Sequence, residues 1–330
     1  MPRILVALLA ILAALPVSAA CTGTDLLAAM PAGQRDALEA AASDQPYPNG
    51  ILWRAERGDQ IIHVIGTLHL HDPRHRATLD RIDTHIARSD TVFLEFGPGD
   101  EKRLQAKIAQ EPDLAFITDG PTLPDQLADE DWNRLRQVMA DRGVPGFLAA
   151  KMKPWMAMTT LGIAKCALHD LQGGLRGLDH MVMERALELG KTPKALEPVE
   201  TLFDIFGSYS PEEQLDLLRL TLDQQLDNPD AQMTTLIEAY FRGEIRLIWE
   251  WSFAVAQDAM GLSDTDWQAQ VARAEEALIN RRNRAWMDRI LPAAADGEVL
   301  VAAGALHLPG EQGLLNLLAR QGFTLTRLAR

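Results

Sequence analysis

After its first twenty residues the chain has no apolar run long enough to cross a membrane. An apolar run over residues 4–15 follows Arg3 and ends shortly before the small residues 18–20. This run is shorter than the roughly 20 residues of a membrane-spanning helix, and its flanks are those of a secretory signal peptide. We therefore expect residues 1–20 to be a signal peptide, and the mature chain to be periplasmic or secreted, without a transmembrane segment.

Cysteine is almost absent, because Cys21 and Cys166 are the only two in 330 residues. Exported chains with two cysteines commonly pair them, since the periplasm is oxidising. The sequence therefore predicts a Cys21–Cys166 disulfide and argues against a thiol nucleophile. The alternative is a lipid anchor on Cys21, although residues 17–20 lack the leucine usually found before a lipoprotein cysteine.

Basic residues are fewer than acidic residues. The chain has 32 Lys and Arg against 46 Asp and Glu, which gives a formal net charge of −14. Such a surface repels phosphate backbones, so nucleic acid is excluded as a partner. The 47% of hydrophobic and 24% of charged residues are ordinary for a folded protein, and we expect a single domain over residues 21–330.

Several common catalytic motifs are missing as well. The sequence has no Walker loop, no G-x-G-x-x-G after a strand, no G-x-S-x-G and no HExxH. Nucleotide binding and a serine-hydrolase elbow are therefore unsupported. A metal site, if present, must be assembled from residues that lie far apart in the chain.

The hydrophobic pattern predicts an α/β (α+β) fold with a central mixed, largely parallel β-sheet and a large helical insertion. Two strand-like runs flank a turn at 57–59 and predict a hairpin, and a helix and a third strand follow. This β-α-β order favours direct parallel pairing of the second and third strands. The predicted segments are strands at 51–55, 60–65, 91–94, 193–197, 298–303 and 323–328, helices at 77–88 and 313–320, and a mostly helical region over about 101–290.

Two stretches repeat one arrangement, in which a hydrophobic strand is followed by Gly-x-x-His. The first contains Gly66 and His69, and the second contains Gly304 and His307. Side chains just beyond the carboxyl ends of parallel strands converge on the ligand crevice of an α/β sheet, and glycine allows a sharp turn there. Glu95 ends another predicted strand, so we expect His69, Glu95 and His307 to face one cleft.

Other polar residues are weaker candidates for the same cleft. Glu197 ends a short predicted strand, while Asp179 precedes a helix predicted from about residue 180 and is explained equally well as its N-cap. Arg282 and Asn283 belong to a charged run, but lie one element before the second Gly-x-x-His. The histidines His71, His75 and His85 are expected on or beside a polar helix face.

Neutral imidazole and carboxylate groups bind Zn²⁺, Mn²⁺ or Co²⁺, and three protein ligands with an open position suit a hydrolytic site. His69, Glu95 and His307 are the predicted ligands. A metal lowers the pKa of its water toward neutrality. The alternative without metal has a histidine and a carboxylate acting as base and acid.

These residues also carry a resemblance to the TraB/GumN family, which takes in the PrgY and Tiki proteins. The similar segments occur in the family's order and cover most of the mature chain. They are HVIGTLHLHDPR (63–74), TVFLEFGP (91–98), GGLRGLDHMVMERALELGKTPKALEPVE (173–200), RRNRAWMDRI (281–290) and VLVAAGALHLPGEQGLLNLLARQGFTLTRL (299–328).

The resemblance implies a site shared with ChaN-like and erythromycin-esterase-like proteins, in which the two histidines and a glutamate act. Tiki proteins are described as metal-dependent proteases. This implies a metal held by His69, Glu95 and His307, with Glu95 and Arg282 as catalytic residues. A periplasmic metal-dependent hydrolase that cleaves peptide bonds is then the expected function, with a peptide or small molecule as substrate.

Two alternatives belong to other functional classes. ChaN-like relatives imply an envelope protein that binds haem or iron, and a non-catalytic peptide-binding protein would keep the residues without the chemistry. PrgY-like relatives imply a third class, a membrane-associated partner that limits peptide-pheromone signalling, but they carry transmembrane segments that we do not expect in this chain. The oligomeric state stays open.

Overall fold

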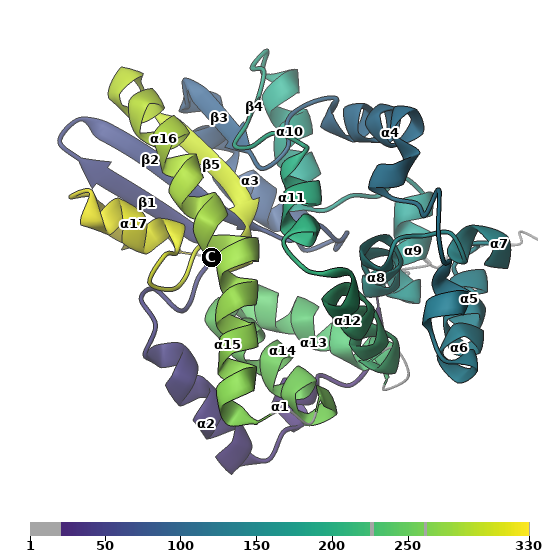
Figure 1. The fold of residues 1–330 in the computed structure, drawn as a ribbon. Helices are drawn as coiled ribbons and strands as arrows, with labels where there is room; N and C mark the ends of the chain where they lie inside the picture. The colour runs from purple at the N-terminus through teal and green to yellow at the C-terminus, as the bar shows by residue number, and fades with distance from the viewer. Residues whose placement is uncertain (1–20, 225–227, 261–262, 330) are drawn as a thin grey trace, which may run out of the picture.

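The computed structural model describes residues 21–224, 228–260 and 263–329 (Figure 1). The expected signal peptide, residues 1–20, lies outside the described residues. Within the described part, a sheet occupies one side of the molecule in Figure 1 and most helices occupy the other.

The sheet has six strands in the order β4-β3-β5-β2-β1-β6. β4, β3, β5 and β2 run parallel to one another, whereas β1 is antiparallel to both β2 and β6. The predicted α/β fold with a mixed, largely parallel sheet is therefore confirmed. The strands are β1 (Leu52–Arg57), β2 (Gln60–Thr67), β3 (Thr91–Leu94), β4 (Lys194–Ala195), β5 (Val299–Gly304) and β6 (Thr324–Arg327).

The predicted hairpin is present as β1 and β2, but the predicted direct pairing of the second and third strands is wrong. β5 lies between β2 and β3 and pairs with both in parallel. All six residues of β5 are apolar or glycine, and its first five are buried. A strand of this composition is best placed in the middle of the sheet, where both faces are covered.

The helices that precede β4 have 4 to 14 residues, and most follow proline or glycine breaks. They are α1 (Leu26–Ala29), α2 (Ala32–Ser43), α3 (His75–Arg88), α4 (Asp100–Gln110), α5 (Leu123–Gln126), α6 (Asp129–Ala140), α7 (Gly146–Ala149), α8 (Pro154–Gly162), α9 (Lys165–Gln172) and α10 (Leu178–Glu188), with the 3₁₀ turn η1 (Pro112–Leu114).

Helices of 7 to 16 residues follow β4. They are α11 (Thr201–Gly207), α12 (Pro211–Gln224), α13 (Pro229–Arg242), α14 (Ile245–Met260), α15 (Asp264–Glu275), α16 (Arg281–Asp296) and α17 (Leu314–Arg320). A π-helical turn, η2 (Glu276–Asn280), leads into α16, and a 3₁₀ turn, η3 (Ala305–His307), follows β5.

Alternate residues of each central strand enter different cores. In β5, Leu300 and Ala302 pack with α3, α10, α13 and α14, whereas Val299 and Val301 pack with α16 and α17. This alternation follows from the two-residue period of a strand. A third apolar cluster joins α6, α8 and α12 away from the sheet. The helical insertion therefore has a core of its own.

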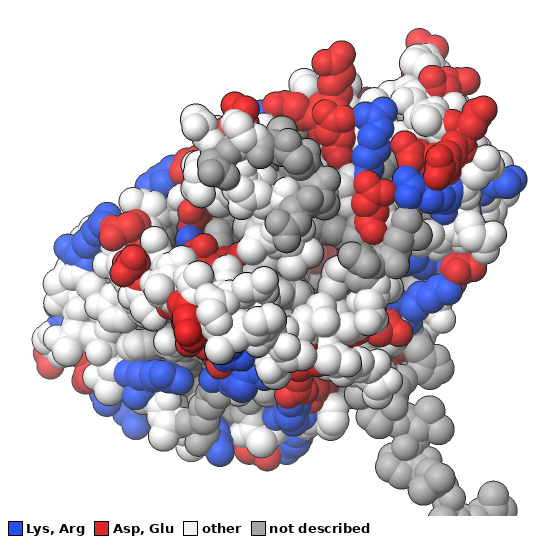
Figure 2. All heavy atoms as spheres, turned by 90° about the horizontal axis from the view of Figure 1, so that it is seen from below, with Lys and Arg blue, Asp and Glu red and all other residues white. Residues whose placement is uncertain are grey.

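Charged side chains are unevenly distributed on the surface. On the face shown in Figure 2, acidic side chains gather along the upper edge, while basic and acidic side chains alternate along the lower edge. Several surface charges are paired along or between helices, as in Arg35–Glu39 within α2 and Lys165–Asp141 between α9 and the end of α6. The acidic surplus therefore coexists with local charge pairing.

The predicted disulfide between Cys21 and Cys166 is present, with a Cα–Cα distance of 5.0 Å. It connects the start of the described chain to α9, 145 positions away. The bond occupies the thiol that a lipid anchor on Cys21 would require. In the described part of the chain, no helix combines the length and apolar character needed to span a bilayer.

Replacing Cys21 and Cys166 together by serine should lower the free energy of unfolding by about 2–5 kcal/mol, because a long loop is no longer closed in the unfolded chain. Urea denaturation of the wild type and the double variant measures this. Adding a reductant should destabilise the wild type and leave the variant unchanged. An unchanged wild-type midpoint under full reduction would contradict the expectation.

Candidate functional site

Three parallel strands end at the same edge of the sheet. Thr67 of β2 is in register with Gly304 of β5, and Leu94 of β3 is in register with Ala302. His69, Glu95 and His307 follow these ends. A β-carbon at position 304 would lie 3.0 Å from Oε1 of Glu95 and 3.7 Å from both Cδ2 of His307 and Nε2 of His69.

The three predicted side chains therefore converge around Gly304. We use the name Gly304 cluster for these three residues together with three charged residues, Asp179, which bonds His69, Arg282, which bonds Glu95 and His307, and Glu197, which bonds Arg282. Both glycines of the repeated motif lie at close approaches. A β-carbon at position 66 would meet Ala305 and Leu308 at 3.1 Å, and the N–H of Gly304 donates to Oε1 of Glu95 over 2.6 Å.

Arg282, from the first turn of α16, is the hub of the cluster. Its Nε and Nη2 donate to Glu197, and Nη2 also donates to Oε2 of Glu95 over 2.6 Å. Nη1 donates to the carbonyl of Leu278 and to Nε2 of His307. These contacts use all five N–H groups of a guanidinium. Arg282 thus holds both carboxylates and one imidazole at once.

Glu95 and Glu197 are both buried. The carboxylate of Glu197 accepts from Arg282 and also from Nε1 of Trp286, over 3.0 Å. Burial opposes ionisation of Glu95, yet the charge of Arg282 and the backbone N–H of Gly304 outweigh it and hold the pKa of Glu95 below its ordinary value. Both carboxylates are therefore compensated by donors that the fold supplies.

His307 is buried and held in one tautomer. Its Nδ1 donates to Oδ1 of Asn283 over 2.7 Å, and the Asn283 amide donates to the carbonyls of His307 and Gln312. The ring lies 4.4 Å from the Trp286 ring. Burial lowers the pKa of His307 to about 3, so its imidazole is neutral and Nε2 carries a lone pair.

His69 differs from His307 in being exposed, with 60% of its side chain accessible. Its Nδ1 donates to Oδ2 of Asp179 over 3.0 Å, which leaves Nε2 free to face the cluster. Desolvation opposes protonation of this ring, but the hydrogen bond and the charge of Asp179 outweigh it and raise the pKa of His69. Asp179 also accepts from His180.

The structure changes the interpretation of Asp179. It is not the N-cap of α10, because the helix begins at Leu178 and its N-cap is Gly177. Asp179 stands in the first helical turn, where the positive end of the helix dipole favours a carboxylate. One of its oxygens bonds two imidazoles and the other is buried without a partner.

Gly177 is a site-forming residue that sequence reasoning missed. A β-carbon there would lie 2.1 Å from the carbonyl oxygen of Leu68 and 2.4 Å from the backbone of His69. The next residue, Leu178, donates its N–H to the same Leu68 carbonyl. Only glycine, which has no β-carbon, allows the backbone at position 177 to pass this close to the Leu68–His69 backbone. The signal in the sequence was Gly177 itself, which follows Gly173 and Gly174 and directly precedes Leu178 and Asp179.

The remaining histidines were in part placed wrongly. His75, expected on a polar helix face, is fully buried, and its Nε2 bonds the carbonyl of Leu70. His85 packs its ring against that of buried His63. His71 borders a small cavity with Leu70, Asp72 and Arg74 outside the Gly304 cluster. The burial of these side chains depends on contacts with other helices and strands, which the periodicity of a single helix does not predict.

The donor types around Gly304 suit a divalent metal. Nδ1 of each imidazole is tied to a partner, and a carboxylate lies beside them; Nε2 of His307 carries a lone pair, whereas Nε2 of His69 must lose its proton before it can bind a metal. However, Nε2 of His307 and Oε2 of Glu95 are both bonded to Arg282. Among the described residues, only His63, His85 and Glu298 have three candidate ligand atoms within 4.8 Å of one another. Metal binding at Gly304 thus requires Arg282 to release His307.

Replacing Arg282 by methionine should cost about 3–5 kcal/mol of unfolding free energy, because Glu95 and Glu197 would be left buried and uncompensated. Adding Glu95→Gln and Glu197→Gln should recover part of that loss. Arg284→Met is the matched control, since Arg284 is exposed on the same helix and should cost at most about 1 kcal/mol. Equal losses of unfolding free energy in the two arginine variants would contradict the central role of Arg282 in the cluster.

Gly177→Ala should destabilise the fold by about 1–3 kcal/mol and displace His69, because the new methyl group overlaps the Leu68–His69 backbone. Denaturation, together with the NMR signals of the His69 ring, measures both effects. Gly33→Ala is the control, since nothing lies near that position in α2. Native stability and an unshifted His69 ring in Gly177→Ala would refute the close approach.

Comparison with known proteins finds relatives that match most of the chain. The chain is 24% identical over 264 residues to the "Uncharacterized protein YbaP" of Escherichia coli (strain K12), covering 79% of this chain and 89% of the relative. The YbaP protein of Shigella flexneri matches to the same extent. The model of the TraB/PrgY/gumN family matches residues 51–327, from β1 to β6 and including the whole Gly304 cluster, and so the chain belongs to the TraB/PrgY/gumN family.

Proposed function

We propose that this protein is an exported hydrolase that cleaves peptide bonds at the Gly304 cluster. The observation that carries the proposal is the convergence of His69, Glu95 and His307 on the space beside Gly304. Two imidazoles and an ionised carboxylate at one point supply the groups needed for acid–base or metal-assisted hydrolysis. They come from the ends of three parallel strands, where ligand sites of α/β sheets lie.

Both imidazoles are fixed in orientation, which supports a chemical role. Asp179 holds Nδ1 of His69, and Asn283 holds Nδ1 of His307. In each ring the second nitrogen is directed to the cluster. Partners of this kind set the tautomer and orientation of histidines that bind metals or transfer protons.

A divalent metal, Mn²⁺, Co²⁺ or Zn²⁺, would be held by His69, Glu95 and His307. When bound, it would polarise the scissile carbonyl and lower the pKa of a water molecule. Nε2 of His69 and Oε1 of Glu95 already face the space beside Gly304. His307 joins them once its Nε2 is released from Arg282.

The remaining residues of the cluster have distinct tasks. His69 is the exposed member and therefore the one that meets a substrate. Arg282 is a positioning residue, because all its N–H groups are bonded within the protein and it acts through Glu95 and His307. Glu197, fixed by Trp286, orients Arg282 in turn.

The substrate class and the location rest on other arguments. Peptide bonds follow from the resemblance to Tiki proteins. Export to the periplasm or the medium follows from the signal-like residues 1–20, and the Cys21–Cys166 disulfide is the kind of bond that an oxidising compartment preserves.

The test is hydrolysis of a mixed library of fluorogenic peptides by the protein purified without chelator. Activity should be abolished by EDTA and restored by Mn²⁺, Co²⁺ or Zn²⁺. His69→Ala should reduce kcat/KM by at least a hundredfold without loss of stability, because this side chain is exposed. Asp179→Asn should reduce it about 10–100-fold, as expected for a partner that orients a ligand.

The matched control is His71→Ala, which removes a neighbouring histidine outside the cluster and should leave activity unchanged. Activity that survives both EDTA and His69→Ala would refute the proposal. Activity that resists EDTA but requires His69 would point to a mechanism without metal, in which His69 and Glu95 act as acid and base. A visible absorption band on adding haem, lost in His69→Ala, without hydrolysis would assign the cluster to haem binding.

A further inference from the structure

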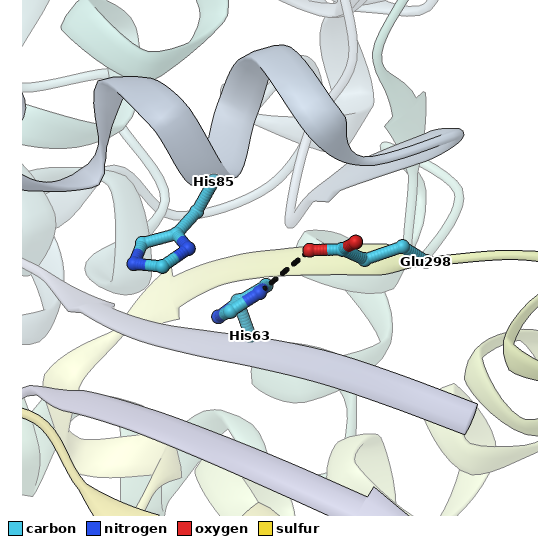
Figure 3. A group of neighbouring side chains, drawn as sticks. All are labelled: His63, His85 and Glu298. Carbon is cyan, nitrogen blue, oxygen red and sulfur yellow. Dashed lines mark hydrogen bonds and ion pairs between the residues drawn. The ribbon is translucent and has the colours of Figure 1, made fainter. Parts of the chain in front are cut away.

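A second histidine cluster lies at the opposite end of the same strands (Figure 3). His63 projects from β2, His85 from α3, and Glu298 immediately precedes β5. Gly304 ends β5, so Glu298 and the Gly304 cluster lie at the two ends of that strand. The second cluster therefore shares no residue with the site described above.

The three side chains point toward one another. Nε2 of His63 bonds Oε1 of Glu298 over 2.8 Å, and the rings of His63 and His85 lie 4.0 Å apart with planes tilted by 30°. Candidate ligand atoms, one from each residue, all lie within 4.8 Å of one another. Ligand atoms of a tetrahedral zinc site are roughly 3.4 Å apart, so binding would draw these side chains closer together.

His63 has an unsatisfied polar atom. Its side chain is 3% exposed, and Nδ1 is buried without a hydrogen-bond partner. Leaving such a nitrogen unpaired costs free energy, about 1–3 kcal/mol for a buried polar group. A purely structural histidine would be expected to bond both ring nitrogens, whereas His63 bonds one.

The surroundings favour neutral rings. Burial lowers the pKa of His63 and of His85, so both imidazoles keep the lone pairs that a metal requires. The charged neighbours are Arg54, which lies beside His63 on β1 and pairs with Glu56, and Arg88, which approaches Glu298 at 3.7 Å. Glu298 is held from the other side, since Asp90 accepts from its backbone N–H.

We propose that His63, His85 and Glu298 bind a divalent transition-metal ion, such as Zn²⁺, Ni²⁺ or Cu²⁺. Two imidazoles and one carboxylate are the ligand types that these ions select. The ion joins β2, α3 and the start of β5, and so stabilises the end of the sheet remote from the Gly304 cluster. Water completes the coordination, because Glu298 is partly exposed.

The test uses His69→Ala protein without a histidine tag, stripped of metal by EDTA, so that the Gly304 cluster cannot dominate binding. Zn²⁺ should bind at about one ion per chain by calorimetry and raise the Tm. Cu²⁺ should give an electron paramagnetic resonance spectrum with splitting from two imidazole nitrogens.

His85→Ala, added to this background, should weaken Zn²⁺ binding at least tenfold, abolish the Tm rise and leave one coupled nitrogen. His85 is the residue to change because it is partly exposed on a helix, where alanine is well tolerated. Glu298→Gln should also weaken binding, while His71→Ala should not. Absence of stoichiometric binding, or binding indifferent to His85→Ala, would overturn the proposal whatever the outcome for hydrolysis.

Discussion

The guanidinium of Arg282 is the point at which the ends of three strands meet. It bonds Glu95 after β3, Glu197 after β4 and His307 after β5, and it has no N–H group left over. Two carboxylates this deeply buried would be strongly destabilising without a cation between them. The positions of these strand ends, and of Gly304 among them, therefore depend on one side chain from α16.

Helix α16 can supply that side chain because it serves two purposes at once. Trp286, Ile290 and Ala294 on one face pack against the sheet, and Arg282 and Asn283 stand one turn earlier, over its edge. The π-helical turn before α16 places the Leu278 carbonyl where it accepts from Arg282. Single π turns are often found at functional sites. The same packing that seals the apolar core thus fixes the polar cluster.

Much of this arrangement could be predicted from sequence, because strand ends are visible as hydrophobic runs that stop at Gly-x-x-His or at Glu95. The order of strands could not, since the insertion of β5 between β2 and β3 joins segments more than 200 positions apart. Nor could the pairing of Asp179 with His69, which depends on the crossing at Gly177. His75 was misplaced because helix periodicity alone does not tell which polar residue a neighbouring helix or strand will cover.

The two ends of β5 show how one sheet can build two kinds of polar cluster. At Gly304 the buried carboxylates are balanced by a guanidinium, and imidazoles sit at its margin. At Glu298 the guanidinium of Arg88 approaches the carboxylate to 3.7 Å, and the carboxylate bonds an imidazole directly over 2.8 Å. The Gly304 cluster already contains a cation, the guanidinium of Arg282. It must give up the Arg282–His307 hydrogen bond before it can bind a metal ion. The second has an unpaired nitrogen on His63 and therefore more to gain from an ion.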